Sequence, residues 1–320
     1  NIDYDIALDL LPIVAIGTIA DVVPLIKENR IYVNEGLKIK PKDKFIGLKK
    51  LMKHSGLTQM TSLDVGFKIA PIINSAGREG FAQKAFQLLT ETSEENVESI
   101  FKEMLDFNDS RKETQKEIEE DIAPKIEAEG KHSLTIFPEK GAYYSASVVG
   151  IVASKVVEKY KLPTIIFAEK EVEFEGEKIK VFSGSRRGVK WFDFMDLITE
   201  MKKENILLYG GGHKLAAGLT ILKENIDRFV ELFEEVAKRT YKPIDTIEVY
   251  EIIELPEDKN SSKNLIKELF KLFKRLEPIG ASNELPKLRF NFGDIQDIKT
   301  MGKDEIKKHF SFRTASGIRV

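Results

Sequence analysis

The stretch 92–122 constrains the architecture of this chain more than any other part of the sequence, because it predicts a single long helix. Thr92 and Glu95 have the spacing of a capping box at its start. Apolar residues recur at helical spacing near both of its ends, whereas the middle, 108–116, is almost wholly polar. A helix that is apolar at both ends and polar between them is typical of a connector between domains, so we expect a multidomain protein.

Beyond this helix, short apolar runs alternate with amphipathic stretches. The run "PTIIFA" predicts a buried strand, and "SVVGIVASKVVEKY" predicts an amphipathic helix that ends at the following Lys-Leu-Pro. This alternation indicates an α/β domain over 131–240. After residue 241, strand-like runs surround a predicted helix at 262–276, a pattern that favours a small β-barrel interrupted by a helix.

Composition excludes several classes of site. The 320 residues include no cysteine, which rules out disulfides, thiolate zinc sites and cysteine nucleophiles and fits a reducing cytoplasm. The four histidines do not lie at metal-ligand spacing, which argues against a His-rich zinc site. The sequence has no run of 18 or more apolar residues, so we expect no membrane span.

The net charge of −2 gives no global sign of nucleic-acid binding, but the charges are unevenly distributed. The segment 94–129 has 13 acidic and 5 basic residues, whereas 261–320 has 13 basic and 7 acidic residues. This asymmetry would place a polyanion contact toward the C-terminal end of the chain. Two solvated surfaces explain the same counts and are the more frequent cause.

The string "GTIADVVPL" places the carboxylate of Asp21 inside an apolar run. Such a carboxylate has to be paired, hydrogen-bonded or bound to a metal, because an isolated buried charge is too costly. A helix cap at a strand–helix junction explains Asp21 at least as well as a metal ligand does.

Two further strings contain residues that would suit a phosphate. In "INSAGREG", Asn74 and Arg78 lie near a predicted turn, which would aim the guanidinium into a cleft or leave it on the surface. In "SGSRRG", Ser185 and Arg187 belong to a predicted loop after a strand, which favours either a phosphate site or an ordinary charged turn.

The string "YGGGHKLAAG" is the strongest local signal. Gly211 and Gly212, with the glycine before them, allow a backbone to approach an anion closely. His213 stands at the predicted start of a short helix of small residues, and both a helix N-terminus and a histidine favour phosphate. A glycine-rich loop beside a core histidine is the alternative.

Six strings in order resemble the RecJ exonucleases of the DHH phosphoesterase superfamily: "VAIGTIADVVPLIKENR", "GFKIAPIINSAGR", "VVGIVASK", "SGSRRG", "GGGHKLAAG" and "LEPIGASNELP". The resemblance implies an α/β multidomain fold. It implies the end of the catalytic DHH domain at 1–90 and a connector helix at 91–130. It further implies a DHH-associated, substrate-binding α/β domain at 131–240, and an incomplete OB-fold β-barrel that binds nucleic acid at 241–320.

The resemblance also implies a site and a mechanism. Asp21 matches a manganese ligand of the family, and Asp21 and His213 would be catalytic. The positions that match phosphate-binding residues are Asn74, Arg78, Ser185, Arg187, Gly211, Gly212 and His213. Two Mn²⁺ or Mg²⁺ ions would activate a water and hydrolyse single-stranded DNA in the 5′→3′ direction, in DNA repair and recombination. Candidate partners are single-stranded DNA, a single-strand-binding protein and a helicase.

The chain departs from the family pattern in having no "DHH" string and no earlier Asp-rich motifs, so we expect a piece of a longer protein that does not cleave DNA alone. Tyr144 and Ser145 stand where the family usually has a Trp-His pair. Two other functions occur on this scaffold. One is a nanoRNA or nucleotide phosphodiesterase, against which the residues beyond Tyr241 argue, and the other is a non-catalytic RecJ-like DNA-binding replication subunit.

Overall fold

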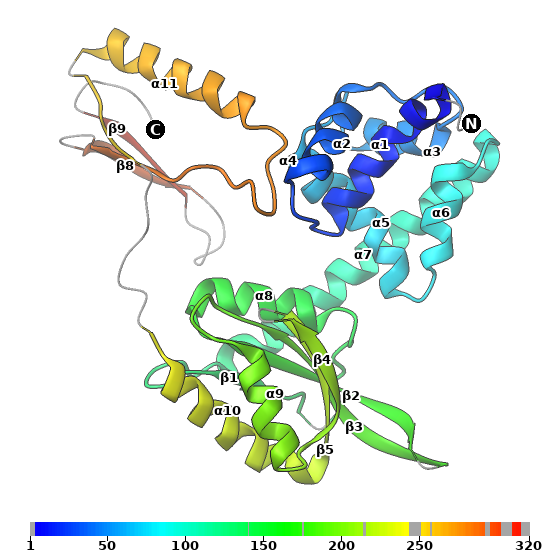
Figure 1. Ribbon diagram of the computed structural model, residues 1–320, viewed down its shortest axis with the longest axis vertical. Coiled ribbons are helices and arrows are strands. Elements are labelled where there is room, and N and C mark those ends of the chain that lie inside the picture. The colour runs from blue at the N-terminus through cyan, green and yellow to red at the C-terminus, as the bar shows by residue number, and fades with distance from the viewer. Residues whose placement is uncertain are drawn as a thin grey trace. The chain divides into compact units, whose positions relative to one another are not determined.

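The computed structural model of this protein describes residues 4–139, 141–174, 176–213, 216–242, 251–256, 258–291, 295–301 and 309–314 (Figure 1). The chain divides into two compact units. The first comprises Asn1–Pro71, Leu88–Val97 and Ile244–Val320, and the second comprises Ile72–Gln87 and Glu98–Pro243. Helices and sheets occur together, which confirms the predicted mixed α/β class, while the four-segment division at residues 90, 130 and 240 stays a prediction.

The predicted long helix is present as α7 (Glu94–Ile122). Its start differs from the expectation: the backbone N–H of Asn96 donates to Oγ of Ser93 at 3.4 Å, so Ser93 caps the helix and the predicted capping box of Thr92 and Glu95 is wrong. The carboxylate of Glu91 adds hydrogen bonds just before the helix, because it accepts from the backbone N–H groups of Thr92 and Ser93.

The N-terminal part of the first unit is helical in the described residues. Its elements are α1 (Tyr4–Ala20), α2 (Lys27–Lys38), α3 (Ile46–His54), α4 (Ser62–Asp64) and the π-helix η1 (Val65–Ile69). Helices α1 and α2 approach closely because Gly36 has no side chain: a Cβ there would lie 2.3 Å from the carbonyl oxygen of Leu11.

The C-terminal part of the first unit contains β6 (Glu251–Glu254), α11 (Lys259–Arg275), β7 (Leu288–Asn291), β8 (Ile295–Met301) and β9 (His309–Thr314). Strands β6 and β7 pair in parallel, and β8 and β9 pair antiparallel. The described strands form no closed barrel, so the OB-fold stays a prediction. The segment after α11 is tied to α2, because Arg30 donates to the carbonyl oxygens of Leu276 and Glu277 at 3.0 and 3.2 Å.

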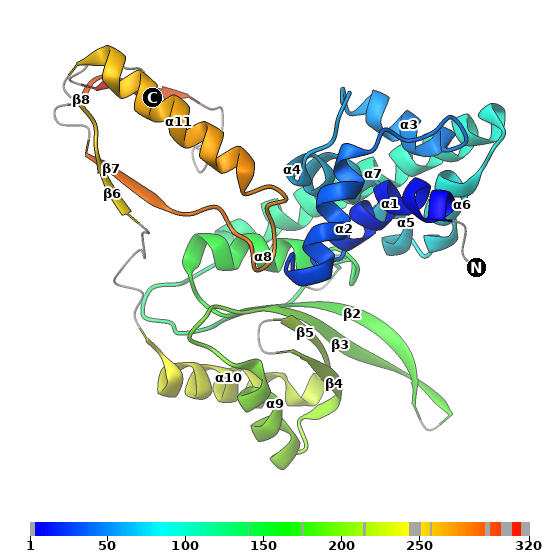
Figure 2. The same cartoon turned by 45° about the horizontal axis from the view of Figure 1, so that its top comes forward.

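The second unit is built on a five-stranded sheet of order β1-β2-β3-β5-β4. Its strands are β1 (Leu134–Ile136), β2 (Thr164–Phe174), β3 (Glu177–Arg187), β4 (Leu207–His213) and β5 (Ala216–Leu222). Strand β1 is parallel to β2, and the other neighbours are antiparallel. Helix α8 (Val149–Tyr160) covers one face, and α9 (Phe194–Lys203) and α10 (Ile226–Thr240) cover the other (Figures 1 and 2).

Alternation along the strands produces a separate core on each face of this sheet. On β2, Ile165 and Phe167 pack toward α9 and α10, whereas Ile166 and Ala168 pack toward α8. A period of two in the side-chain direction accounts for this division. The strand predicted for "PTIIFA" and the helix predicted for "SVVGIVASKVVEKY" are confirmed as β2 and α8.

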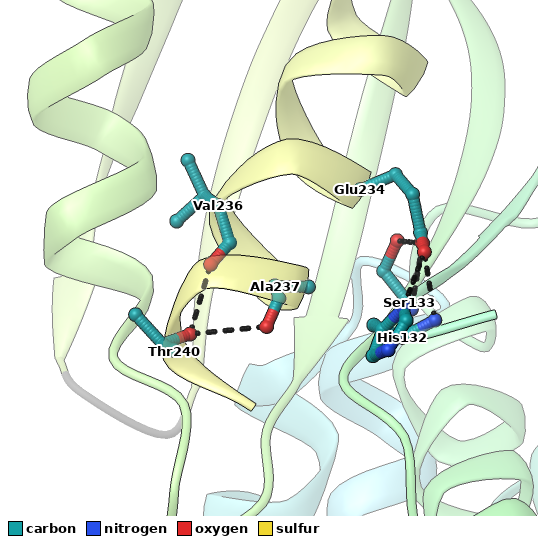
Figure 3. Close-up of polar contacts among 6 residues, drawn as sticks. All are labelled: His132, Ser133, Glu234, Val236, Ala237 and Thr240. Atoms are coloured by element: carbon teal, nitrogen blue, oxygen red, sulfur yellow. Dashed lines mark hydrogen bonds and ion pairs between the residues drawn. The ribbon is translucent and has the colours of Figure 1, made fainter. Parts of the chain in front are cut away.

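A carboxylate of α10 holds the start of β1. Glu234 accepts hydrogen bonds from the backbone N–H groups of His132 and Ser133, both at 2.9 Å, and from Oγ of Ser133 at 2.7 Å (Figure 3). At the end of α10, Oγ1 of Thr240 donates to the backbone carbonyl oxygen of Val236 at 2.9 Å, which gives this carbonyl of the last turn a hydrogen-bond donor (Figure 3).

Among the described residues, none of the helices is both long and apolar enough to span a membrane.

Candidate nucleic-acid interface

Three arginines of the second unit, on α5 (Ala70–Arg78), α7 and β3, lie close enough for the charge of Arg78 to act on Arg111 and Arg187. Arg78, in the last turn of α5 rather than in the predicted turn, donates to the backbone carbonyl of Ser147. Burial lowers the pKa of Arg78. The pKa of Arg187 is also lowered, by burial and then by the positive charge of Arg78. Like charges therefore face one another in partly desolvated surroundings, which is unfavourable until an anion binds.

Strand β3 holds Arg187 in place. Its Nε donates to Oγ of Ser154 on α8 at 2.9 Å, and its Nη1 donates to the carbonyl oxygen of Arg186 at 2.9 Å. Gly150 makes room for this arrangement: a Cβ there would lie 2.7 Å from Oγ of Ser185 and 3.1 Å from Nη2 of Arg187. Ser185 and Arg187 were expected in a loop after the strand, but both belong to β3 itself.

Sequence reasoning missed the third arginine, Arg111, because it assigned the polar middle of α7 to a solvated connector. Instead, Asn108 and Gln115 are buried, and they accept hydrogen bonds from the Arg111 guanidinium at 2.7 and 2.9 Å. Burial and the charge of Arg78 lower the pKa of Arg111, with Asp109 opposing them. Three polar side chains at positions i−3, i and i+4 of one helix face were the available signal.

None of the ion pairs between described residues involves Arg78, Arg111 or Arg187. We call these residues the arginine cluster. Guanidinium groups suit phosphate because their planar donors can form paired hydrogen bonds with its oxygens. The arrangement can therefore bind a phosphate or another anion.

The neighbouring arginine has the opposite environment. Arg186 is 0% exposed and lies with its guanidinium 5.3 Å from the ring centroid of Phe194 on α9. Its Nη2 donates to the carbonyl oxygen of Gly211 at 3.0 Å, while Nε and Nη1 have no hydrogen-bond partner among the described residues. Burial lowers the pKa of Arg186 to about 10. Of the two arginines in "SGSRRG", Arg186 is therefore a buried core residue, and only Arg187 belongs to the arginine cluster.

The triglycine string forms a strand and not the predicted loop before a helix. Gly211 and Gly212 belong to β4, and the small residues after His213 form β5, so the helix N-terminus expected there is absent from the described residues. The hairpin pairs Gly211 with Gly218 and His213 with Ala216. The Leu-Thr-Ile run after the small residues favours a strand, and β5 lies between β3 and the glycine-rich edge strand β4.

The register relates this hairpin to β3. Ser185 lies opposite Gly218, which lies opposite Gly211, and Arg187 lies opposite Ala216, which lies opposite His213. Residues directly opposite in a sheet share one face. The backbone positions of Ser185, Arg187, Gly211 and His213 are thus brought to the face that α8 covers in part; the side chain of His213 lies outside the described residues.

The remaining predicted site residues are Asn74 and Asp21. Asn74 lies on the exposed side of α5, one turn before Arg78. Asp21 directly follows α1 in the first unit, is exposed, and uses its backbone N–H to donate to the carbonyl oxygen of Gly17 at 3.1 Å. It therefore does not cap a helix start at a strand–helix junction. The described residues contain no group of three or more His, Cys, Asp or Glu residues placed to hold a metal ion.

Comparison with known proteins agrees with this picture. Residues 133–239 match the family model of the DHHA1 domain. The chain is 30% identical over 310 residues to the single-stranded-DNA-specific exonuclease RecJ of Bacillus subtilis (strain 168), which corresponds to 96% of this chain and 38% of that protein. RecJ of Thermus thermophilus is 29% identical over 313 residues, 98% of this chain and 42% of the relative.

Solved structures give the same result. The crystal structure of RecJ in complex with Mg²⁺ from Thermus thermophilus has a TM-score of 0.80 and 28% identity, over 98% of this chain and 46% of that chain. The complex of RecJ with Mn²⁺ from the same organism also has a TM-score of 0.80 and 28% identity, over 98% and 43% of the two chains. The chain spans only 38% to 42% of the length of these two curated relatives, yet nearly all of it matches them. Sequence and structure together show that this chain is a RecJ-like member of the DHH superfamily.

Proposed function

We propose that this chain holds single-stranded DNA for a 5′→3′ exonuclease that hydrolyses phosphodiester bonds in DNA repair and recombination. The observation that carries the proposal is the arginine cluster: Arg78, Arg111 and Arg187 lie together without an ion pair to any described residue. The names of the relatives support single-stranded DNA as the substrate.

The cluster would bind the sugar–phosphate backbone. A phosphate between Arg78 and Arg187 would relieve the repulsion between their charges, and the partial burial of Arg187 would strengthen its contact relative to bulk water. Asn74, Ser185, Gly211, Gly212 and His213 would contribute further donors in the same unit. Their role is to fix the strand, so that the scissile bond is presented in one orientation.

The next feature is the metal site that the predicted two-ion hydrolysis requires. The described residues do not fit a two-ion site by themselves, because Asp21 supplies a single exposed carboxylate and no group of three metal-binding side chains is present among them. The Mg²⁺ and Mn²⁺ complexes of the relative support the use of a divalent ion by the whole protein, and Asp21 as one of its ligands stays a prediction. The count of two ions, the catalytic role of His213 and a helicase or single-strand-binding protein as partner stay predictions.

The test is a binding titration of the 320-residue chain with a fluorescent single strand at several salt concentrations. We expect Arg187→Gln to weaken binding about tenfold or more, because one charge-assisted contact is lost. The dependence of log affinity on log salt should become shallower by about 0.7.

The matched control is Arg228→Gln. Arg228 lies on α10 and is paired with Glu204 at 2.6 Å and with Glu231 and Glu235 at 3.4 and 3.3 Å, so the same charge is removed away from the proposed site. Equal affinities of the two variants, or no binding by the unaltered chain, would refute the proposal. Tighter binding to very short RNA than to DNA would instead support a nanoRNA phosphodiesterase.

A further inference from the structure

Strand β4 carries an exposed aromatic residue immediately before the triglycine string. Tyr209 has 51% of its surface exposed, although it lies within a sheet. Its ring makes an edge-on contact with Phe174 at the end of β2, with centroids 6.4 Å apart and planes at 77°. The hydroxyl has no hydrogen bond to a described residue, so the contact with Phe174 is the main structural role that can be assigned to the ring.

The register places Tyr209 on the same face as the proposed phosphate contacts. Tyr209 lies opposite Thr220, which lies opposite Ser183, and Ser185 and Arg187 follow Ser183 on the same face of β3. The flanking residues of β3 and β5, such as Phe182 and Leu219, point to the opposite face and belong to the core under α9 and α10. Tyr209 and Gly211 therefore follow one another along a single face of β4.

The space beside Tyr209 is open. A Cβ built on Gly211 would meet no atom within 4 Å, and the same is true of Gly218, its partner on β5. Gly210 differs, because a Cβ there would lie 2.9 Å from the side chain of Leu207 on the core face. The paired Gly211 and Gly218 thus form a glycine floor, without side chains, between Tyr209 and Arg187.

We propose that Tyr209 is a stacking platform for one base of the bound strand, an inference that rests on the proposed function. The rise along a strand puts Tyr209 about 7 Å from Gly211 and about 13 Å from His213. A nucleotide with its phosphate over the glycine floor would have its base within reach of the ring. Aromatic rings stack on any base, so this contact adds affinity without reading sequence.

The contact would also favour single strands over duplexes. Bases in a duplex are already stacked on their neighbours, and separating them costs free energy. A single strand offers its bases without that cost, whereas the arginine cluster alone binds phosphates of either form. Tyr209 is therefore a positioning residue that adds selectivity for single-stranded substrates to the charge of Arg78, Arg111 and Arg187.

The test uses the 320-residue chain, a fluorescent single strand and a fully abasic strand of the same length. Tyr209→Ala should weaken binding to the normal strand at least about fivefold and leave binding to the abasic strand unchanged. Tyr209→Phe should bind both strands like the unaltered chain, because the ring is retained. Tyr209→Leu, which keeps an apolar contact with Phe174, should behave like Tyr209→Ala if the ring acts by stacking.

Several results would overturn the inference. The first is an unchanged affinity of Tyr209→Ala and Tyr209→Leu for the normal strand. The second is an equal loss of affinity for the normal and the abasic strand, because that result would assign the effect to folding or to phosphate contacts. Failure of the proposed function is distinguishable, because then the unaltered chain would bind neither strand or Arg187→Gln would bind both normally. Thermal unfolding of each variant verifies that the compared proteins are folded.

Discussion

Substitution of Gly150 by alanine gives the sharpest test of how the site is assembled. Gly150 lies in the first turn of α8, where exchanging glycine for alanine favours the helix by about 1 kcal/mol. The new Cβ would lie 2.7 Å from Oγ of Ser185 and 3.1 Å from Nη2 of Arg187, so both side chains would have to move.

The cost of that movement follows from the bonds of Arg187. Its guanidinium is held by Ser154 and by the carbonyl of Arg186, both at 2.9 Å, and losing one of these bonds costs about 1 kcal/mol. Overpacking adds roughly 1–3 kcal/mol. The gain in helix propensity offsets part of this sum, so we expect the free energy of unfolding to fall by about 1–3 kcal/mol. Displacement of Arg187 should weaken single-strand binding about tenfold.

Urea denaturation measures the first effect and fluorescence anisotropy with a labelled strand measures the second. Gly66→Ala in η1 is the matched control, because the nearest atom to a Cβ there is Cγ2 of Ile19 at an ordinary 3.9 Å. The control should not weaken binding. If Gly150→Ala binds the strand as tightly as the unaltered chain, then neither Ser185 nor Arg187 needs its present position, and the assignment of the site is refuted.

Two further predictions concern stability. Arg186→Met should raise the free energy of unfolding by about 1–3 kcal/mol in urea denaturation, because it removes buried donors without partners among the described residues; a decrease would reveal a partner for the guanidinium. Burial would raise the pKa of Glu234, but hydrogen bonds from Ser133 and His132 outweigh it and lower the pKa below the ordinary value of 4.5. The carboxylate therefore stabilises the fold above about pH 4.5 and loses this effect as the pH falls through the lowered pKa. We expect Glu234→Gln to have a lower free energy of unfolding than the unaltered chain at about pH 7, and to lose less of it on acidification to about pH 3. Equal losses of unfolding free energy for both proteins would contradict the prediction.

The second unit could be predicted well because its periodicity is local. The apolar run at 164–168 and the amphipathic helix at 149–160 are each determined by residues within a few positions, and the structure has both. The string after His213 could not be assigned in the same way. Small residues are compatible with a helix or a strand, and pairing with β3 and β4, which is a non-local interaction, selects the strand.

The candidate site likewise contains residues that the sequence predicts and one, Arg111, that it does not predict. Arg78, Ser185 and Arg187 could be predicted from strings that resemble a family, and the structure brings them into one unit. Arg111 could not, because the polar middle of α7 has the composition of a solvated face. Only the fold shows that Asn108 and Gln115 are buried and direct the guanidinium of Arg111.

The two neighbouring arginines of β3 connect stability with function. Strand alternation sends Arg187 to the face of the arginine cluster and Arg186 into the core, where it donates to the carbonyl oxygen of Gly211 from beneath the glycine floor. A buried cation with unsatisfied donors destabilises a core, and features of this kind are retained mainly at functional sites. A phosphate above Gly211 would be separated from this charge by a single layer of backbone and would be attracted by it. If that attraction is why the charge is kept, Arg186→Met should gain stability and lose affinity for the strand together, whereas a core residue without a functional role would change stability alone.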